Sequence, residues 1–271
     1  MPELPEVETT RRGIAPYLEG KRIAALRVRE RRLRWPVPEG LEAQVAGARV
    51  QALERRAKYL LLRLDCGTLI LHLGMSGSLR VLPATDPPQR HDHLDLVLEG
   101  GYCLRLRDPR RFGALLWCPD SPEAHPLLRD LGPESLSADF DGPYLAQVAA
   151  GRRVPVKSLI MDSGVVVGVG NIYASESLFL AGIHPQRACR RISAARYARL
   201  VGSIRQVLTA AIQQGGTTLR DFRQADGSPG YFALSLRVYG RAGAPCPRCG
   251  APIQARRIGQ RSSFFCPHCQ H

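Results

Sequence analysis

Four cysteines near the end of the chain place the strongest constraint on its fold. Cys246 and Cys249 form one C-x2-C pair, and after sixteen intervening residues Cys266 and Cys269 form a second. Two tight knuckles with this spacing present four thiolates tetrahedrally, which suits one structural Zn²⁺ and leaves no open position for catalysis. Paired disulfides are the alternative, and a cytosolic setting disfavours them. The pattern therefore predicts a small zinc-pinned hairpin.

The charge balance indicates a polyanionic partner. The chain of 271 residues carries 38 Lys and Arg against 24 Asp and Glu, which gives a net charge of +14. Such an excess is typical of nucleic-acid-binding proteins, with a merely basic soluble protein as the plain alternative. No stretch approaches the roughly 18 apolar residues of a membrane span, and the chain does not begin like a signal peptide. We therefore expect a cytosolic protein with no membrane partner.

Lysine is rare in this chain. Lys21, Lys58 and Lys157 are the three lysines among the 38 basic residues, so the other 35 are arginine. A lysine retained in such a chain is a candidate for a task that arginine does not perform, such as exchanging a proton or presenting a compact ammonium group. Lys58 and Lys157 become candidates, whereas Lys21 shows that lysines also occur in ordinary contexts.

Hydrophobic periodicity divides the chain into regions. Residues 3–19 place apolar side chains on one helical face, with prolines near the start, where they are tolerated. From about 22 to 117 the period falls to two around glycine-containing turns, which predicts an antiparallel sandwich or barrel. Residues 118–150 have the pattern of a linker. Helices are expected over 172–181 and over 193–214, the latter between Ser193 as N-cap and Gly215 as C-cap.

Two glycine-rich segments flank these helices. VVVGVGN leads into the first, with Asn171 expected as its cap, and such a helix start is a weak indication of a phosphate site. GGTTLRDFRQADGSPGYF follows the second and is longer than an ordinary connection. Loops of this length are usually functional or disordered, so residues 215–238 are a candidate functional region.

The opening PELPEVE permits two interpretations. Removal of Met1 is permitted when a small residue follows, and Pro2 would then carry a secondary amine with a pKa near ~8. Such an amine attacks an electrophilic carbon to form an iminium, and the adjacent Glu3 is placed to handle protons. Alternatively, Pro2, Glu3 and Glu6 begin a helix and complement its dipole. Spacing alone favours the helix start.

Two glycine-bearing motifs at expected hairpin ends, HLGMSGSLR and DPRRFG, carry an apolar wedge beside arginine. Met75 and Phe112, with Arg110 and Arg111 beside them, suit a protein that enters a base stack and fills the vacated space. Met75, Arg110 and Phe112 are called the wedge residues below. For Met75 or Phe112 taken alone, core packing is the more ordinary interpretation.

Two further motifs are ambiguous. His91 and His93 are expected on one strand face, where a metal pair, phosphate contact and packing all remain open. Between the cysteine pairs, QARRIGQRSSFF offers Arg256, Arg257 and Arg261 to phosphates, with solvated surface charge as the equal alternative.

Together these motifs resemble one family. PELPEVE, KYLL from Lys58, HLGMSGSLR, DPRRFG, GVGNIYASE, GGTTLRDF and the cysteine module occur in the order found in bacterial formamidopyrimidine-DNA glycosylases, also called 8-oxoguanine DNA glycosylases. Only residues 118–150 lack a matching motif. The resemblance implies an α+β fold, with an antiparallel β-sandwich and flanking helices over 1–130. It further implies a helix-two-turn-helix domain over 131–236, including a lesion-recognition loop at 215–236, and a zinc-ribbon-like finger over 237–271.

The resemblance also implies an activity. The family flips oxidised purines, namely 8-oxoguanine and formamidopyrimidines, out of duplex DNA and excises them. Its members are bifunctional, because a lyase step then cuts the strand by β,δ-elimination. The expected partner is double-stranded DNA containing an oxidised purine or an abasic site. We also expect one structural Zn²⁺ and no catalytic cofactor, in a monomer of the bacterial cytoplasm that associates with the nucleoid through DNA.

Residue roles follow from the resemblance position by position. Pro2 is implied as the nucleophile that attacks C1′ and forms the iminium, and Glu3 as the acid/base that helps to open the sugar. Lys58 is implied in phosphate contact and β-elimination, and Arg261 in δ-elimination. The wedge residues match the trio that fills the gap left by the flipped base. DNA contacts are implied at His72, His91, Arg110, Arg152, Lys157, Asn171 and Tyr239, and Arg220 lies in the lesion loop.

Two rival functions remain open. The sister branch, endonuclease VIII, acts mainly on oxidised pyrimidines, typically begins Pro-Glu-Gly-Pro-Glu and lacks the complete wedge. PELPE with all three wedge residues favours the purine branch. The second rival is a catalytically silent lesion binder that uses the same wedge and finger.

Overall fold

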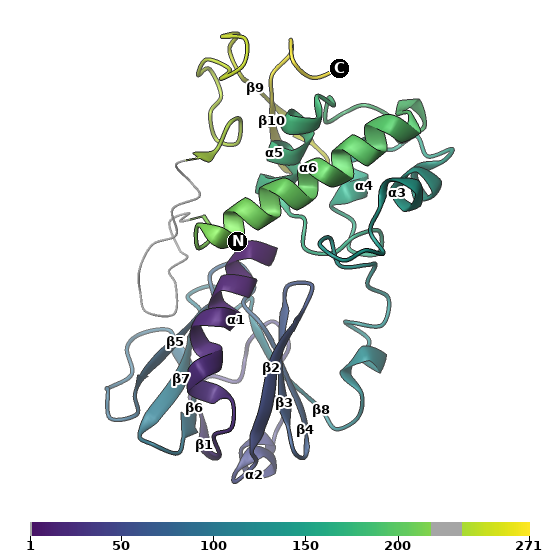
Figure 1. Cartoon of the computed structure of the whole chain (residues 1–271). Coiled ribbons are helices and arrows are strands. Elements are labelled where there is room, and N and C mark those ends of the chain that lie inside the picture. The colour runs from purple at the N-terminus through teal and green to yellow at the C-terminus, as the bar shows by residue number, and fades with distance from the viewer. Residues whose placement is uncertain (1, 218–234) are drawn as a thin grey trace. The chain divides into compact units, whose positions relative to one another are not determined.

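The computed structural model describes residues 2–217 and 235–271 (Figure 1). They fall into two compact units, one of residues 2–129 with 214–217 and the other of residues 130–213 with 235–271. Each unit contains its own cluster of buried apolar side chains.

The first unit is a sandwich of two four-stranded antiparallel sheets, which Figure 1 shows as two layers. One sheet has the strand order β1-β6-β7-β5 and consists of β1 (Ile23–Val28), β6 (Asp92–Leu98), β7 (Tyr102–Arg107) and β5 (Ser78–Pro83). The other has the order β2-β3-β4-β8 and consists of β2 (Val50–Arg56), β3 (Tyr59–Leu64), β4 (Gly67–His72) and β8 (Ala114–Cys118). The predicted antiparallel sandwich is confirmed.

The period of two explains how the sheets share a core. Side chains alternate between the two faces of a strand, so every second residue points inward. The core contains such alternating leucines of β3 and β6: Leu60, Leu62, Leu64, Leu94, Leu96 and Leu98. Two of the hairpins expected around glycine-containing turns are β3–β4, in LLLRLDCGTLILHL, and β6–β7, in LDLVLEGGYCLRLRD.

Helix α1 (Leu4–Leu18) packs along β2, β3 and β5. This confirms the helix predicted over 3–19; Glu3 is its N-cap, and it buries Val7, Ile14 and Leu18 in the sandwich core. A second, short helix α2 (Leu41–Val45) lies in the region expected to hold only strands. Its five residues bury only Leu41 and Val45, which is too short a pattern for a helical period to be recognised.

The second unit is mainly helical. It contains α3 (Gly142–Ala149), α4 (Val156–Ile160), α5 (Asn171–Ala181) and α6 (Ala194–Gln213), followed by the hairpin of β9 (Gln254–Ile258) and β10 (Arg261–Phe265). Helix α6 begins directly after Ser193 and ends before Gly215, whose φ of 73° is left-handed, so this prediction is confirmed. Within residues 2–217 and 235–271, no helix has both the length and the apolar character needed to cross a membrane.

Two expectations in this unit were wrong. Residues 118–150 are more than a linker, because they contain α3, which Asp141 caps by accepting a hydrogen bond from the Tyr144 N–H at 2.7 Å. Asn171 does not cap α5. Gly170 is the N-cap in an extended conformation, and Asn171 is the first helical residue, with its side-chain oxygen occupied by Lys157. The domain boundaries remain a prediction, and the lesion loop lies largely at positions 218–234, outside the described residues.

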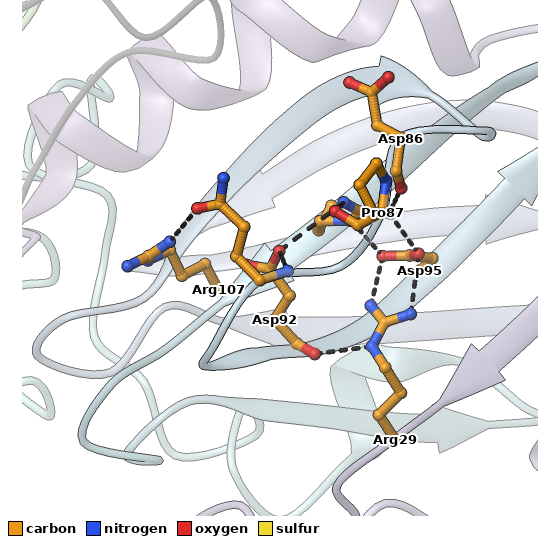
Figure 2. A network of polar contacts seen from close by, with 8 residues as sticks. Arg29, Asp86, Pro87, Asp92, Asp95 and Arg107 are labelled. Carbon is orange, nitrogen blue, oxygen red and sulfur yellow. Dashed lines mark hydrogen bonds and ion pairs between the residues drawn. The ribbon is translucent and has the colours of Figure 1, made fainter.

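A buried ionic network braces the first sheet. The Asp95 carboxylate accepts hydrogen bonds from the guanidinium of Arg29 at 2.9 and 2.6 Å and from that of Arg105 at 2.8 and 2.9 Å (Figure 2). Burial opposes ionisation of Asp95, but the two guanidinium groups outweigh it and keep the Asp95 pKa below its usual value. The network therefore joins β6, β7 and the residue that follows β1.

A similar ionic network surrounds Glu8 of α1, and its contribution to stability can be tested. It accepts hydrogen bonds from Arg11 and Arg12 at 2.8 Å and from Arg55 of β2 at 3.1 Å. Burial opposes its ionisation, but the arginines outweigh it and lower the Glu8 pKa from 4.5 to about 2. We expect Glu8→Gln to lower the free energy of unfolding at pH 7 by about 2 kcal/mol, because ionic hydrogen bonds are lost.

The pH dependence of this loss has a defined sign. The folded pKa of Glu8 lies below the unfolded one, so its stabilisation is complete above pH 4.5 and disappears as pH falls toward 2. Urea denaturation of both proteins at pH 7, 5 and 3 should show a difference that narrows with acid. A constant difference across this range would contradict the assigned network.

Candidate functional site

The start of α1 is fixed by a buried glutamate. Glu3 and Glu6 are each 2 % exposed, and Pro2 is buried beside them. Oε2 of Glu6 accepts a hydrogen bond from the Glu3 N–H at 2.8 Å, which is one half of a capping box. Oε1 of Glu6 accepts from both the N–H and the hydroxyl of Thr217, at 2.8 and 2.9 Å. The peptide that joins Pro2 to Glu3 is therefore held at a defined position.

Gly216, which precedes Thr217, also lies close to the Glu6 side chain. The φ of Gly216 is +80°, and a Cβ added there would lie 3.1 Å from Oε1 of Glu6. Both the conformation and the space favour glycine at this position.

Lys58 lies in the turn between β2 and β3 and is half-buried. Its neighbour Ala57 has a left-handed φ of 54°. Arg55 donates to the Ala57 carbonyl at 2.9 Å and to Glu8 of α1 at 3.1 Å. Arg55 therefore ties the turn that carries Lys58 to the helix that follows Pro2.

His72, the last residue of β4, is arranged as a neutral donor. Burial and the nearby charges of Lys58 and Arg34 lower its pKa to about 4. Its Nδ1 accepts a hydrogen bond from the Gly74 N–H at 3.0 Å, and its ring lies 4.8 Å from that of Tyr59. A neutral imidazole that accepts at Nδ1 carries its proton on Nε2, so His72 has one N–H donor at neutral pH.

The structure brings the three wedge residues together. They line a pocket of about 510 Å³, whose other lining residues are Arg32, Leu33, Arg34 and Arg111. The Arg110 guanidinium lies 4.8 Å from the centre of the Phe112 ring, and Phe112 is 39 % exposed. Gly74 permits this arrangement, because its φ is +62° and an added Cβ would lie 2.3 Å from the Phe112 carbonyl carbon. Sequence patterns did not predict that residues 32–34 share this pocket.

The expectation that His91 and His93 share a strand face was wrong. His91 precedes β6 and has a left-handed φ of 74°, and a register irregularity separates Asp92 from Leu94. His93 is buried, with Nε2 at 2.7 Å from the Asp108 carbonyl oxygen. The two rings still lie edge to face, with their centres 6.3 Å apart, although only His93 belongs to the strand interior.

In the helical unit, Lys157 is the centre of a buried group. It is 2 % exposed, and its ammonium donates to Oδ1 of Asn171 at 2.7 Å, to Oγ of Ser263 at 2.8 Å and to the Ser262 carbonyl at 3.2 Å. The Asn171 amide in turn donates to the Tyr239 hydroxyl at 3.4 Å. Three predicted contact residues therefore lie together, although Lys157 itself is enclosed by protein acceptors.

Arg152 and Arg261, two further predicted site residues, are both exposed, unlike Lys157. Arg261 opens β10 directly after the turn of the zinc hairpin, and Arg152 lies in the segment before α4. Arg220 lies outside the described residues.

Sequence reasoning missed Glu176, a fully buried glutamate of α5. Its Oε1 accepts hydrogen bonds from the N–H groups of Val238 and Tyr239, and its Oε2 from that of Arg237, each at 2.9 Å. The signal was an acidic residue inside an otherwise apolar helix, because such a residue needs polar partners. Glu176 thus fixes the main chain that carries Tyr239.

The four terminal cysteines suit a tetrahedral metal ion. Their sulfur atoms all lie within 4.8 Å of one another. The sulfur atoms of Cys246 and Cys269 are 3.9 Å apart, and those of Cys249 and Cys266 are 3.5 Å apart. Tetrahedral Zn–S bonds of about 2.3 Å would separate sulfurs by about 3.8 Å, whereas a disulfide needs about 2.05 Å. The donor set therefore fits one structural zinc ion.

Three family models match the chain in order. Residues 1–115 match the formamidopyrimidine-DNA glycosylase N-terminal domain, residues 131–223 the formamidopyrimidine-DNA glycosylase H2TH domain, and residues 243–271 the zinc finger found in FPG and IleRS. The helix-two-turn-helix prediction is confirmed. Together with the geometry of the thiolates, the last match establishes one structural zinc ion.

Individual proteins are similar over their whole length. Formamidopyrimidine-DNA glycosylase of Alkalilimnicola ehrlichii is 63% identical over 276 residues, which covers 100% of both proteins. Two solved structures of Lactococcus lactis Fpg each have a TM-score of 0.92 and 33% identity, with 100% of both chains covered. One is a mutant in complex with DNA that contains Fapy-dG, and the other is a complex with DNA that contains an abasic site.

Removal of the metal gives a test of the finger. Without zinc, the core around it should open, because Cys246 and Cys266 pack there with Phe179, Val238 and Ile253. We expect chelation to expose residues 243–271 to protease while the sandwich stays protected, as measured by mass spectrometry of the fragments. Readdition of Zn²⁺ should restore protection. An unchanged cleavage pattern in a preparation shown to be metal-free would contradict this dependence.

Proposed function

The chain belongs to the formamidopyrimidine-DNA glycosylase family, and on that basis we propose that it is a base-excision-repair enzyme that removes oxidised purines from duplex DNA. We infer further that it is bifunctional and also cleaves the strand as an abasic-site lyase. The observation that carries this proposal is the fixed start of α1, where Glu6 holds the peptide between Pro2 and Glu3. A nucleophile has to be aligned with its target carbon, and this contact supplies the alignment.

The proposed chemistry begins at the Pro2 nitrogen after Met1 is removed. The nitrogen forms a bond to C1′ as the bond from C1′ to the base breaks, and the base leaves with the electron pair and takes up a proton. Glu3 takes the proton that the nitrogen loses after it has bonded to C1′ and passes it to the ring oxygen of the sugar, which opens and leaves an iminium between Pro2 and C1′. Glu3 directly follows Pro2 in the chain, and its side chain is buried.

Strand cleavage then follows by elimination. Loss of a proton from C2′ expels the 3′ phosphate, and Lys58 is proposed to contact phosphate and to transfer the proton. Arg261 is proposed to assist the second elimination, which expels the 5′ phosphate. Both roles are supported by position, since Lys58 is tied to α1 through Arg55 and Arg261 lies at an exposed hairpin turn.

The duplex is proposed to be held by neutral and cationic donors. His72 offers its Nε2–H to a phosphate without the cost of a buried charge, and exposed Arg110 and Arg152 supply charge. The wedge residues fill the space of the flipped base. Lys157 acts through Asn171 and the hairpin, because its ammonium is already enclosed by protein acceptors.

The setting that we propose is the bacterial cytoplasm, where the protein acts as a monomer on the nucleoid. The structural zinc holds the finger, and the reaction uses no catalytic cofactor. The pyrimidine-preferring branch and the catalytically silent binder are the two functions against which this proposal is tested.

Borohydride trapping separates an enzyme from a silent binder. We expect the protein to form a covalent adduct with a duplex that carries one 8-oxoguanine, and the linked peptide should begin at Pro2. Pro2→Gly should abolish adduct formation and base release while duplex binding stays within about two-fold, because the secondary amine is lost and the contact surface remains. Pro5→Ala is the matched control and should be trapped as efficiently as the wild type. Undiminished trapping of Pro2→Gly would refute the assignment.

The preferred lesion distinguishes the purine-preferring branch of the family from the pyrimidine-preferring branch. Single-turnover excision of 8-oxoguanine should be at least about ten-fold faster than that of thymine glycol in the same duplex, because a site built for one base leaves polar groups unpaired with the other. Faster release of thymine glycol would place the protein with the pyrimidine-preferring relatives.

A further inference from the structure

Asp108, the first residue of the DPRRFG motif, is a buried carboxylate with no part in the proposed chemistry. It is 0 % exposed, so protein groups have to satisfy its charge. Its Oδ1 accepts a hydrogen bond from the Ser76 hydroxyl at 2.6 Å, and its Oδ2 accepts one from the Gly113 N–H at 2.7 Å. These donors lie in the two loops that carry the wedge residues.

The two hydrogen bonds reach residues adjacent to Met75 and Phe112, and a third bond connects Arg110 to the same group. Ser76 directly follows Met75, and its hydroxyl oxygen also accepts a hydrogen bond from the Arg110 N–H at 3.2 Å. Gly113 directly follows Phe112. One carboxylate therefore sets the spacing between the turn at Met75 and the loop that holds Arg110 and Phe112.

The main chain of Asp108 also holds two unusual backbone conformations. His91 and Arg111 have φ values of 74° and 55°, in the left-handed region that residues with a side chain rarely adopt. The Asp108 N–H donates to the His91 carbonyl at 3.0 Å, and the Asp108 carbonyl accepts from the Arg111 N–H at 3.1 Å. Conformations of this kind persist only where the surroundings over-determine them, and they cluster at functional sites.

We propose that Asp108 is a positioning residue for base displacement, which holds the three wedge residues in the arrangement that enters the base stack. This inference rests on the proposed function and deepens it. A wedge offsets the cost of unstacking only if its side chains are already arranged when the duplex arrives. Loosening the two loops should therefore slow displacement of the base without affecting the reacting atoms at Pro2.

Two variants loosen the loops. Asp108→Asn keeps the shape of the side chain but removes its charge, and Ser76→Ala removes the hydroxyl that joins Asp108 to the Arg110 N–H. We expect each to slow single-turnover release of 8-oxoguanine from a duplex by about ten-fold or more, since small misplacements of positioned groups have effects of this size. The fluorescence of a 2-aminopurine base placed beside the lesion reports unstacking of the duplex, and its rise should be slowed to the same extent as the release of 8-oxoguanine.

A second substrate isolates the chemistry from displacement. In a single-stranded oligonucleotide with one abasic site, no stacked base has to be displaced, so borohydride trapping of both variants should stay within about two-fold of the wild type. If trapping falls as far as release, Asp108 acts on the chemistry or the fold and the inference is overturned. Should Asp108→Asn fail to fold, Ser76→Ala decides the question alone.

Asp95→Asn is the matched control. Asp95 is 2 % exposed and lies in the same sandwich, but its partners Arg29 and Arg105 belong to the sheet network of Figure 2 and to neither wedge loop. It should lower the melting temperature while release and trapping remain as in the wild type. Equally slowed release in Asp95→Asn would overturn the inference.

The same experiments separate this inference from the proposed function. If the wild-type protein forms no adduct, the proposed function is overturned as well. If adducts form normally but Asp108→Asn and Ser76→Ala release 8-oxoguanine as fast as the wild type, this inference alone is overturned.

Discussion

Buried carboxylates that accept backbone N–H groups fix the candidate functional residues within each of the two units. Glu6 fixes the peptide after Pro2, Asp108 fixes the loops around the wedge residues, and Glu176 fixes the main chain at Tyr239. Each is at most 2 % exposed, so leaving any of its oxygens without a donor would carry a large desolvation cost. Because their acceptor atoms are charged, these hydrogen bonds are stronger than ordinary ones, and because most of the donors are main-chain groups, they fix the backbone itself. Loops without regular secondary structure thereby acquire defined positions.

Arginine performs a related task in the sandwich. Its planar guanidinium group donates several hydrogen bonds at once, so two arginines satisfy Asp95 and three surround Glu8. Arginines in such groups are held by carboxylates of the fold, which leaves them less free to contact a polyanion. The arginines that suit this purpose are exposed ones such as Arg110, Arg152 and Arg261. Counting basic residues indicates the class of partner, whereas only the structure shows which of them are available to it.

The sequence was informative wherever a pattern was long and local. The twenty residues of α6, the β3–β4 and β6–β7 hairpins and the spacing of the four cysteines each specify their own structure. Helices α2, α3 and α4 have five to eight residues, which is too few for a helical period to stand out. The buried carboxylates were missed for another reason, since Glu6 and its partner Thr217 lie 211 positions apart. No local pattern marks such a pair, and Glu6, at the start of a helix, has the sequence pattern of an ordinary capping residue.

Lys157 shows how the structure can give a rare residue a physical cause that its rarity does not reveal. Its rarity suggested a task that arginine does not perform, and a contact near the lesion was expected. In the structure a compact ammonium group meets acceptors from Asn171 at the start of α5 and from Ser262 and Ser263 of β10. A planar guanidinium on a longer side chain would not converge on these three atoms in the same space, so the requirement for lysine is geometric. Ser262 directly follows Arg261, and the hairpin that carries this arginine is therefore held twice within one unit, by zinc at its cysteine knuckles and by Lys157 near its turn.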